Sequence, residues 1–254
     1  MKARLPKRRV AANKRALHDR VVVILVNPRN PLNVGAAARA MSNFGFQQLR
    51  LVNPYAIAFR EARSAVGASA LLAGAKEYGD LAEAIADCSL VIGTTAARDR
   101  KLEQELKDLS KGAEVIRRKI QSGRVAVLFG SEKRGLSNRD LSWCHWLLRI
   151  PTREDQPSMN LGQAVAVCLF ELSKKSKSPI TPPTQEGAAT SEDTDRVTQI
   201  LLDALQISGY FKSPNASAEE TIRRFVHRLT PSQSDAQLWL GMLRQMKWQM
   251  INGK

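Results

Sequence analysis

The sequence predicts an α/β protein with a parallel sheet flanked by helices, followed by a small helical C-terminal extension. Short runs rich in Val, Ile and Leu alternate with helical segments, as expected for parallel strands buried on both faces. A Pro-, Ser- and Thr-rich stretch then interrupts the alternation, and beyond it apolar residues recur at helical spacing. A chain of 254 residues can bury one large core and carry a small appendage.

The expected elements follow in order along the chain. We expect strands over residues 21–26, 48–52, 89–93, 125–129 and 146–150. We expect helices over residues 34–44, 63–73, 80–87, 111–121 and 160–174. Gly45 and Gly123 are suited to the helix ends before the second and fourth strands, because glycine readily adopts the left-handed C-cap conformation.

Composition divides the chain into four segments. Residues 1–20 are expected to form a basic flexible arm, which either lies on RNA phosphates or is a solvated tail without a role. An organelle transit peptide is the third option, although this segment contains no serine. Residues 21–175 are expected to form the α/β domain, and residues 176–194 the linker. Residues 195–254 are expected to form the helical extension.

The net charge of +15 and the pI near 10.2 indicate a polyanionic partner, of which nucleic acid is the first candidate. Cys88, Cys144 and Cys168 lack metal-ligand spacing, so we expect neither a metal site nor a disulfide framework. The longest apolar runs are too short to cross a bilayer, and the basic leader lacks the apolar core of a signal peptide. We therefore expect a cytoplasmic protein without a membrane partner.

A glycine loop follows the strand expected over residues 125–129. An apolar strand that ends in such a loop predicts a ligand site, because open α/β sheets bind ligands at the carboxyl ends of their strands. Gly130 and Gly135 have the spacing of a phosphate loop, yet Leu136 stands where that loop needs a lysine. This argues against a nucleotide hydrolase. Taken alone, the loop is equally compatible with a plain turn.

Two further segments decide between these interpretations. One runs from Val21 through Asn27-Pro28 to Asn33-Val34-Gly35-Ala36-Ala37-Ala38-Arg39, and the other contains Ile150-Pro151 and Pro157-Ser158-Met159-Asn160-Leu161. With the glycine loop, they resemble in order and spacing the three motifs of the SpoU-type (TrmH) RNA ribose 2′-O-methyltransferases of the SPOUT superfamily. The tail from Asp195 to Met250 is similar to the C-terminal extension of the TrmJ branch, which methylates a ribose in the tRNA anticodon loop.

This resemblance implies S-adenosylmethionine as the cofactor, a deep trefoil knot, a homodimer that composes each active site from two chains, and tRNA as the partner. The position methylated by the TrmJ branch is 32. The residues that match the family's donor site are Thr94, Thr95, Ala96, Gly130, Ser131, Glu132, Gly135, Ile150, Ser158, Met159 and Asn160. In this family these loops lie at the ends of three strands.

The expected catalytic residues are Arg39, Ser158, Asn33 and Glu132. Asn33 is expected to be the N-cap of a helix that carries Arg39 in its second turn, within reach of a bound phosphate or ribose. A guanidinium stays protonated, so its expected role is to anchor the adjacent phosphate and stabilise the developing alkoxide.

Three side chains have two interpretations each. Ser158 is expected to hydrogen-bond either the acceptor ribose or the donor, and Glu132 either to orient its loop or to pair with Arg39 or Arg134. Asn160 is expected either to cap the following helix or to shape the site.

Two alternative functions remain at this stage. The three motifs do not separate tRNA from ribosomal RNA, so a ribosomal RNA 2′-O-methyltransferase is the first alternative. The second is a non-catalytic RNA-binding protein with the same fold. The presence of Asn33, Arg39, Glu132 and Asn160 argues against the second alternative.

Overall fold

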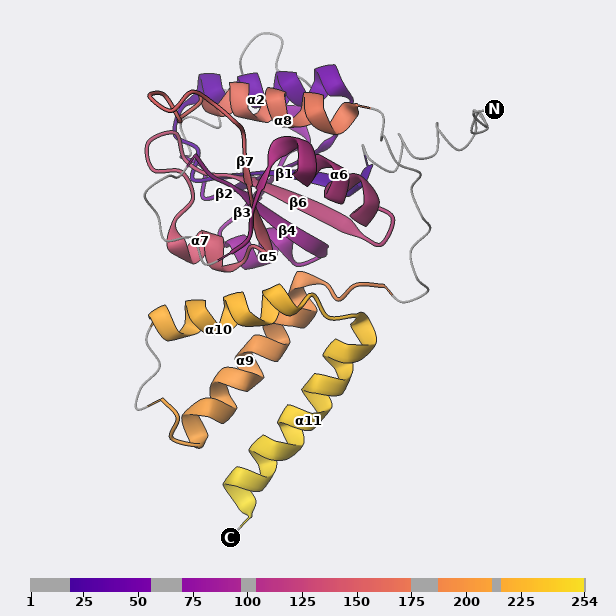
Figure 1. The fold of residues 1–254 in the computed structure, drawn as a ribbon, viewed down its shortest axis with the longest axis vertical. Helices are drawn as coiled ribbons and strands as arrows, with labels where there is room; N and C mark the ends of the chain where they lie inside the picture. Colours follow the sequence, from indigo (N-terminus) through magenta and orange to yellow (C-terminus); the bar gives the residue numbers. More distant parts are fainter. Residues whose placement is uncertain (1–18, 56–69, 97–103, 175–186, 212–215, 254) are drawn as a thin grey trace, which may run out of the picture.

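The computed structural model describes residues 19–55, 70–96, 104–174, 187–211 and 216–253. Most of the expected basic arm and most of the expected linker lie outside these residues. The α/β part occupies the upper half of Figure 1, and three C-terminal helices lie below it. Among the described residues, no helix combines the length and the apolar character needed to cross a membrane.

Seven parallel strands form one sheet, in the order β3-β2-β1-β6-β4-β7-β5. They are β1 (Val21–Val26), β2 (Gln48–Val52), β3 (Lys76–Tyr78), β4 (Cys88–Thr94), β5 (Leu106–Asp108), β6 (Arg124–Phe129) and β7 (Trp146–Arg149). The five expected strands and the parallel sheet are confirmed, whereas β3 and β5 at the two edges were not expected. Every residue of β1 is buried, because helices cover both faces of this central strand.

One face of the sheet is covered by α2 (Pro31–Phe44), α4 (Ala70–Ala73), α6 (Leu109–Lys119) and α8 (Leu161–Ser173). Helices α2 and α8 lie side by side in Figure 1. Their approach is close enough that a Cβ built on Gly162 of α8 would lie 2.6 Å from Cβ of Ala36 on α2. Ala36 and Gly162 therefore allow the two helices to pack closely.

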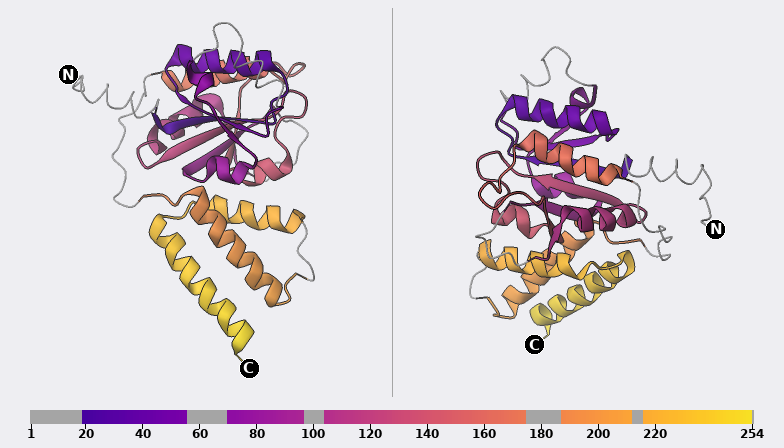
Figure 2. Two further views of the ribbon diagram at one scale, coloured as in Figure 1. Left: turned by 180° about the vertical axis from the view of Figure 1, so that it is seen from behind. Right: turned by 45° about the horizontal axis from the view of Figure 1, so that its top comes forward.

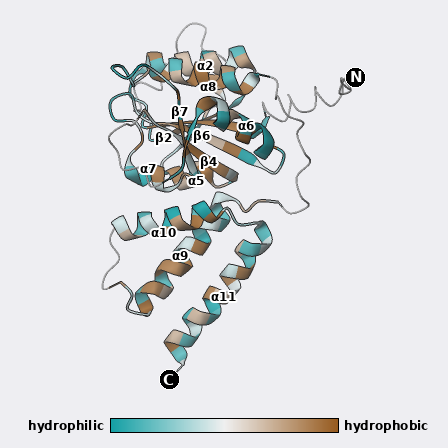
Figure 3. Cartoon of the chain, in the orientation of Figure 1, coloured by the Kyte–Doolittle hydropathy of each residue, from teal (hydrophilic) through white to brown (hydrophobic). Residues whose placement is uncertain are grey.

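The other face carries α5 (Leu81–Ile85) and α7 (Asn138–Ser142). Beyond them lies the C-terminal unit, made of α9 (Ser191–Ile207), α10 (Ala216–Leu229) and α11 (Gln233–Asn252). Both views of Figure 2 show this unit on the side of the sheet opposite to α2 and α8. Apolar and polar residues are mixed along α11 in Figure 3, and several of its large apolar side chains, such as Leu238 and Trp248, are exposed.

Several helix ends differ from those expected. Helix α2 begins at Pro31 and is capped by Asn30, whose side chain accepts from the Leu32 amide, so the expectation that Asn33 is the N-cap was wrong. Gly45 ends α2 in the left-handed conformation as predicted. Gly123 is not a cap, because α6 already ends at Lys119. A capping box begins each of the helices α7, α9 and α11. The paired residues are Ser137 with Asp140, Thr190 with Asp193, and Ser232 with Asp235.

The start of α9 is fixed to the first residues of β4. Oγ of Ser191 donates a 3.0 Å hydrogen bond to the carbonyl of Cys88, and the Glu192 amide donates a 3.1 Å bond to the carbonyl of Ala86. Helix α9 begins at Ser191, so the last four residues of the expected linker are helical. Each bond joins the C-terminal unit to the α/β domain.

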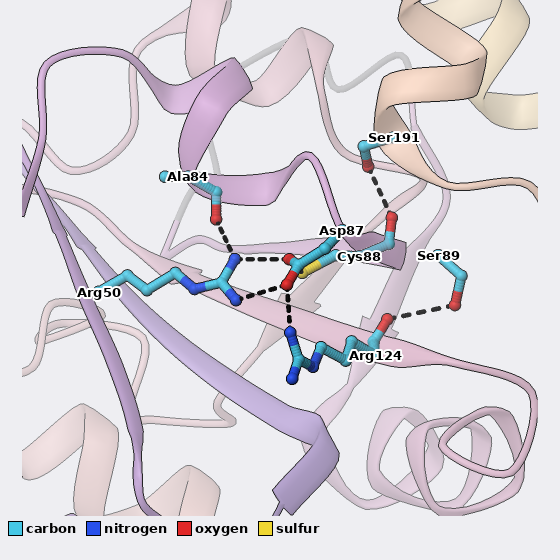
Figure 4. A network of polar contacts seen from close by, with 7 residues as sticks. All are labelled: Arg50, Ala84, Asp87, Cys88, Ser89, Arg124 and Ser191. Carbon is cyan, nitrogen blue, oxygen red and sulfur yellow. Dashed lines mark hydrogen bonds and ion pairs between the residues drawn. The ribbon is translucent and has the colours of Figure 1, made fainter. Parts of the chain in front are cut away.

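A charged network lies beside this junction, as Figure 4 shows. The buried guanidinium of Arg50 donates two hydrogen bonds to the carboxylate of Asp87, at 2.6 and 2.9 Å, and a third bond to the carbonyl of Ala84 at 2.7 Å. Arg124 pairs with the same carboxylate. Burial opposes the charge of Asp87, yet the hydrogen bonds from both arginines hold the pKa of this carboxyl well below its usual range. The network therefore fixes the turn that receives α9.

Candidate functional site

A cavity of about 610 Å³ lies at the carboxyl ends of β4, β6 and β7, where the sequence predicts a ligand site. Its walls come from three loops. After β4 they are Thr94, Thr95 and Ala96; after β6 they run from Gly130 to Leu136; after β7 they include Ile150, Thr152, Glu154, Pro157, Ser158 and Met159. The floor is apolar and includes Phe129, Leu141, Leu148 and Leu161.

The glycine loop closes on itself. Its backbone forms an isolated bridge between Ser131 and Gly135, and the Gly135 amide donates a 2.8 Å hydrogen bond to the Ser131 carbonyl. A Cβ built on Gly130 would lie 2.0 Å from the carbonyl carbon of Gly135. Gly135 has a φ of +66°, which favours glycine. A side chain at residue 130 would therefore clash within the loop before it met any ligand.

Glu132 joins the glycine loop to the start of α2. Its carboxylate accepts hydrogen bonds from the amides of Arg29 and Asn30, at 3.1 and 3.0 Å, and from Nδ2 of Asn33 at 3.0 Å. Burial opposes the negative charge, but the hydrogen bond from Asn33 and the backbone donors lower the pKa of Glu132 below its usual value. Glu132 is therefore an anionic anchor for the helix N-terminus.

Asn33 and Asn160 extend this connection to the third motif. Nδ2 of Asn160 donates to Oδ1 of Asn33 at 2.8 Å. Oδ1 of Asn160 accepts from the amides of Gly162 and Gln163, so the same side chain caps α8. The capping interpretation of Asn160 is therefore confirmed, and its contact with Asn33 links the third motif to α2.

The structure brings most of the predicted donor-site residues together. Thr94, Thr95, Ala96, Gly130, Ser131, Glu132, Gly135, Ile150, Ser158 and Met159 line the cavity, and Asn160 lies behind its wall. Arg39 is exposed on α2 and is not part of the lining. The contacts described for Glu132 are with residues 29, 30 and 33, so the expected pairing with Arg39 or Arg134 is not among them.

Several residues of the site were missed. Asn30 caps α2 and donates its amide to Glu132, and Pro31 behind it is the signal that could have identified it, because proline is favoured in the first turn of a helix. Leu136 and Leu141 line the cavity from below. Their apolar character beside a polar loop was the only indication in the sequence.

A family model described as the SpoU rRNA Methylase family matches residues 20–170. The chain belongs to this family. The matched range begins just before β1 and ends within α8, so it contains all three loops of the cavity. The C-terminal unit lies beyond the range and is not part of this SpoU match.

Curated relatives of this SpoU family member extend the comparison. The tRNA (cytidine-2′-O-)-methyltransferase TrmJ of Methanocaldococcus jannaschii is 43% identical over 164 residues, which cover 61% of this chain and 68% of that protein. The tRNA (cytidine/uridine-2′-O-)-methyltransferase TrmJ of Yersinia pestis strain Pestoides F is 30% identical over 241 residues, which cover 92% of this chain and 93% of that protein. The second relative therefore also matches the C-terminal unit.

A solved structure agrees with this similarity. The crystal structure of TrmJ from Z. mobilis ZM4 superposes with a TM-score of 0.75 at 31% identity. The superposition covers 89% of this chain and 98% of that chain. The arrangement of α/β domain and helical unit is thus similar in the two proteins.

The residues of the cavity fit the methyl donor that SpoU methylases use. The volume lies within the range of small-molecule and cofactor sites, and the apolar floor offers a surface for an adenine ring. The loops supply backbone groups to a ribose, and Glu132 and Glu154 at the wall supply negative charge for a cationic ligand. S-Adenosylmethionine combines these features, since it carries adenine, ribose and a sulfonium.

Proposed function

We propose that this protein transfers a methyl group from S-adenosylmethionine to a ribose 2′-hydroxyl of tRNA. The cavity formed by the three predicted loops carries this proposal. Ribosomal RNA is the second candidate, and the description of the matching family favours it. The relative that also matches the C-terminal unit is named as a tRNA enzyme, which supports tRNA as the first candidate.

The donor would be held by loop backbones at the ends of β4, β6 and β7. When bound, it supplies an electrophilic methyl group. Gly130 and Gly135 keep the middle loop folded close to β6, and Glu132 fixes that loop to α2. Oγ1 of Thr94 donates to the carbonyl of Leu128 at 2.8 Å, so its side chain shapes the end of β4. Most of the acceleration would come from holding the two reactants in line.

We assign the acceptor side of the reaction to Arg39 from a second copy of the chain. Arg39 follows Asn33 by six residues, about 9 Å along α2, and it lies outside the cavity of its own chain. The outer surface of α2 and α8 also exposes Leu32 and Phe170, whose side chains are 77% and 53% accessible. These apolar residues support a homodimer through α2 and α8.

In this dimer Arg39 of one copy would anchor the RNA phosphate beside the cavity of the other. It would stabilise the developing alkoxide, and the proton would leave to phosphate or water, because a guanidinium is a poor base. Ser158 at the cavity wall would hydrogen-bond the ribose or the donor.

Subunit mixing tests the shared site. Arg39→Ala and Gly130→Val are each expected to be inactive as pure proteins. A mixed dimer carries one intact combination, namely the cavity of the first variant with Arg39 of the second. Random exchange should therefore restore about one quarter of the wild-type activity. Activity that stays absent in verified mixed dimers would contradict a site composed of two chains.

We propose position 32 of the anticodon loop as the target, with the C-terminal unit and the basic arm gripping the tRNA body. The net charge of +15 supports phosphate contacts and a steep loss of affinity with salt. The assay is methyl incorporation into full-length tRNA, an isolated anticodon stem-loop and a ribosomal RNA fragment, each with mapping of the methylated nucleotide. Preference for the ribosomal fragment would favour the second candidate.

We also infer a trefoil knot and a cytoplasmic location. Membership of the SpoU family supports the knot, because the resemblance to this family implies one. The three described cysteines are free and buried, as suits a reducing compartment. Mechanical unfolding tests the knot. When a knotted chain is pulled from its two ends, the knot tightens and the extended length is shorter than the full contour length.

A further inference from the structure

Residues 138–148 connect two walls of the donor cavity and also carry the contact with the C-terminal unit. They follow the glycine loop, which ends at Leu136, and they precede Ile150. Leu141 in α7 lines the cavity, while the adjacent Trp143 is only 6% exposed and packs under α10. One short segment therefore faces both the donor and the C-terminal helices.

Arg223 of α10 is the centre of this contact. It is 3% exposed, and its guanidinium lies 4.2 Å from the centroid of the Trp143 ring. Nη1 donates to Oγ of Ser142 at 3.3 Å, and Glu219 on the same helix pairs with Nη2. A desolvated cation over an indole ring is a strong cation–π contact. Undocking α10 would remove both contacts with the 138–148 segment.

His227, one turn further along α10, adds a second contact. Its ring is fully buried and lies edge-on to the rings of Trp143 and His145, at centroid distances of 5.9 and 5.1 Å. His145 is in turn paired with β4, since its Nδ1 accepts from the Val91 amide at 3.1 Å. The contact therefore reaches from α10 to the central sheet.

The other attachment of the C-terminal unit is at the start of the same strand. Ser191 and Glu192 bond to the carbonyls of Cys88 and Ala86, and β4 then runs to Thr94 in the cavity wall. Strand β4 is thus held at its first residue by α9 and near its middle through His145. Both attachments lie on elements that end at the donor site.

We propose that the C-terminal unit is a positioning element for the donor cavity, with Arg223 as its principal positioning residue. This inference rests on the proposed function. Docking of α10 against the α/β domain and binding of S-adenosylmethionine in the cavity favour each other, and residues 130–148 connect the two events. Because such coupling is reciprocal, donor binding should also hold α10 in place. The helical unit then supports the catalytic domain in addition to contacting RNA.

The test compares Arg223→Ala with Lys247→Ala in the full-length chain. Lys247 on α11 pairs with Asp203 on α9 at 2.7 Å, so its loss perturbs the C-terminal unit without touching α7. Calorimetry with S-adenosylmethionine should show affinity at least about fivefold weaker for Arg223→Ala and nearly unchanged for Lys247→Ala. Arg223→Lys keeps the charge but loses the planar fork, and it should give an intermediate affinity.

Hydrogen exchange supplies two further readouts, one without the donor and one with it. Amides of residues 130–148 should exchange faster in Arg223→Ala than in the wild type, and saturating donor should slow exchange in α10 of the wild type. Unchanged donor affinity and unchanged exchange in 130–148, with α10 itself exposed, would overturn the proposal. A wild type that binds no donor would contradict the proposed function, while the exchange comparison without donor would still decide whether α10 stabilises residues 130–148. Should Arg223→Ala fail to fold, Ser142→Ala replaces it, because it removes the acceptor of Arg223 together with only one bond to the Arg139 carbonyl.

Discussion

Nδ2 of Asn160 donates a 2.8 Å hydrogen bond to Oδ1 of Asn33, although the two residues are 127 positions apart in the chain. Asn33 passes the connection to Glu132, and Asn160 also accepts from the first amides of α8. The N-termini of α2 and α8 are therefore held by one chain of hydrogen bonds. These hydrogen bonds join the three motifs to one another beside the cavity.

Asn160→Asp separates capping from bridging. The carboxylate keeps the cap on α8, but it cannot donate to Asn33 and it adds negative charge near Glu132. We expect a loss of about 0.5–1.5 kcal/mol in the free energy of unfolding, measured by urea denaturation. Asn160→Ser, which also caps without bridging, should lose a similar amount. Wild-type stability of both variants would show that only the cap matters.

Gly130→Ala should destroy the donor site, because its Cβ would lie 2.0 Å from the carbonyl carbon of Gly135. Donor affinity should fall by well over tenfold, or about 1.4 kcal/mol and more, in calorimetry. Gly35→Ala is the matched control, since a Cβ there meets nothing within 4 Å. It should leave donor binding unchanged and raise stability by about 0.4–1 kcal/mol. Equal donor affinity in the two variants would place the pocket elsewhere.

Arg39→Ala should abolish methyl transfer while the fold and donor binding stay nearly intact. The side chain is exposed on α2 and does not line the cavity, so its removal leaves no buried group unpaired. Turnover, thermal melting and donor calorimetry together measure the three properties. Arg118→Ala, an exposed arginine on α6, controls for general loss of positive charge. Near-normal turnover of Arg39→Ala would refute the assigned role.

Acid should weaken the contact between α10 and the α/β domain. Burial lowers the pKa of His145 to about 4 and that of His227 well below 6.5, with Arg223 and His145 adding repulsion for His227. The unfolded chain therefore binds more protons below pH 6.5, so the free energy of unfolding should fall as the pH drops from 6.5 towards 4. The slope is up to about 1.4 kcal/mol per pH unit for each histidine.

Urea denaturation at several pH values measures this slope. His227→Gln should remove the contribution of one histidine, so its stability should depend less steeply on pH than that of the wild type. An unchanged slope in His227→Gln would mean that His227 does not titrate differently in the two states. The comparison of variants also removes the contribution of carboxylates, which both proteins share.

The central strands and the three cavity loops could be predicted because buried strands leave long apolar runs. The edge strands could not. Residues 76–78 and 106–108 are three-residue segments of mixed polarity, and their pairing depends on the backbone of the neighbouring strand. Helix α7 has five residues, too few to show a period.

The prediction of the site from the sequence was limited in a similar way. Its loops are local in sequence, so their residues could be named in advance. The bond between Glu132 and Asn33 joins positions 99 residues apart, and no local pattern encodes it. Asn33 was expected to cap α2 because it precedes the small residues, yet Pro31 shifts the start of the helix and makes Asn30 the cap. The sequence likewise did not reveal that α10 packs against α7.

The three buried cysteines can report which part of the fold unfolds first. Burial raises the pKa of Cys88 and of Cys168 to about 12 and also raises that of Cys144, so the native thiols should resist alkylation. Cys88 lies where α9 is attached, Cys144 beside the α10 contact, and Cys168 within α8 on the opposite face. The order in which the thiols react with a labelling reagent would therefore reveal which face of the sheet comes apart first.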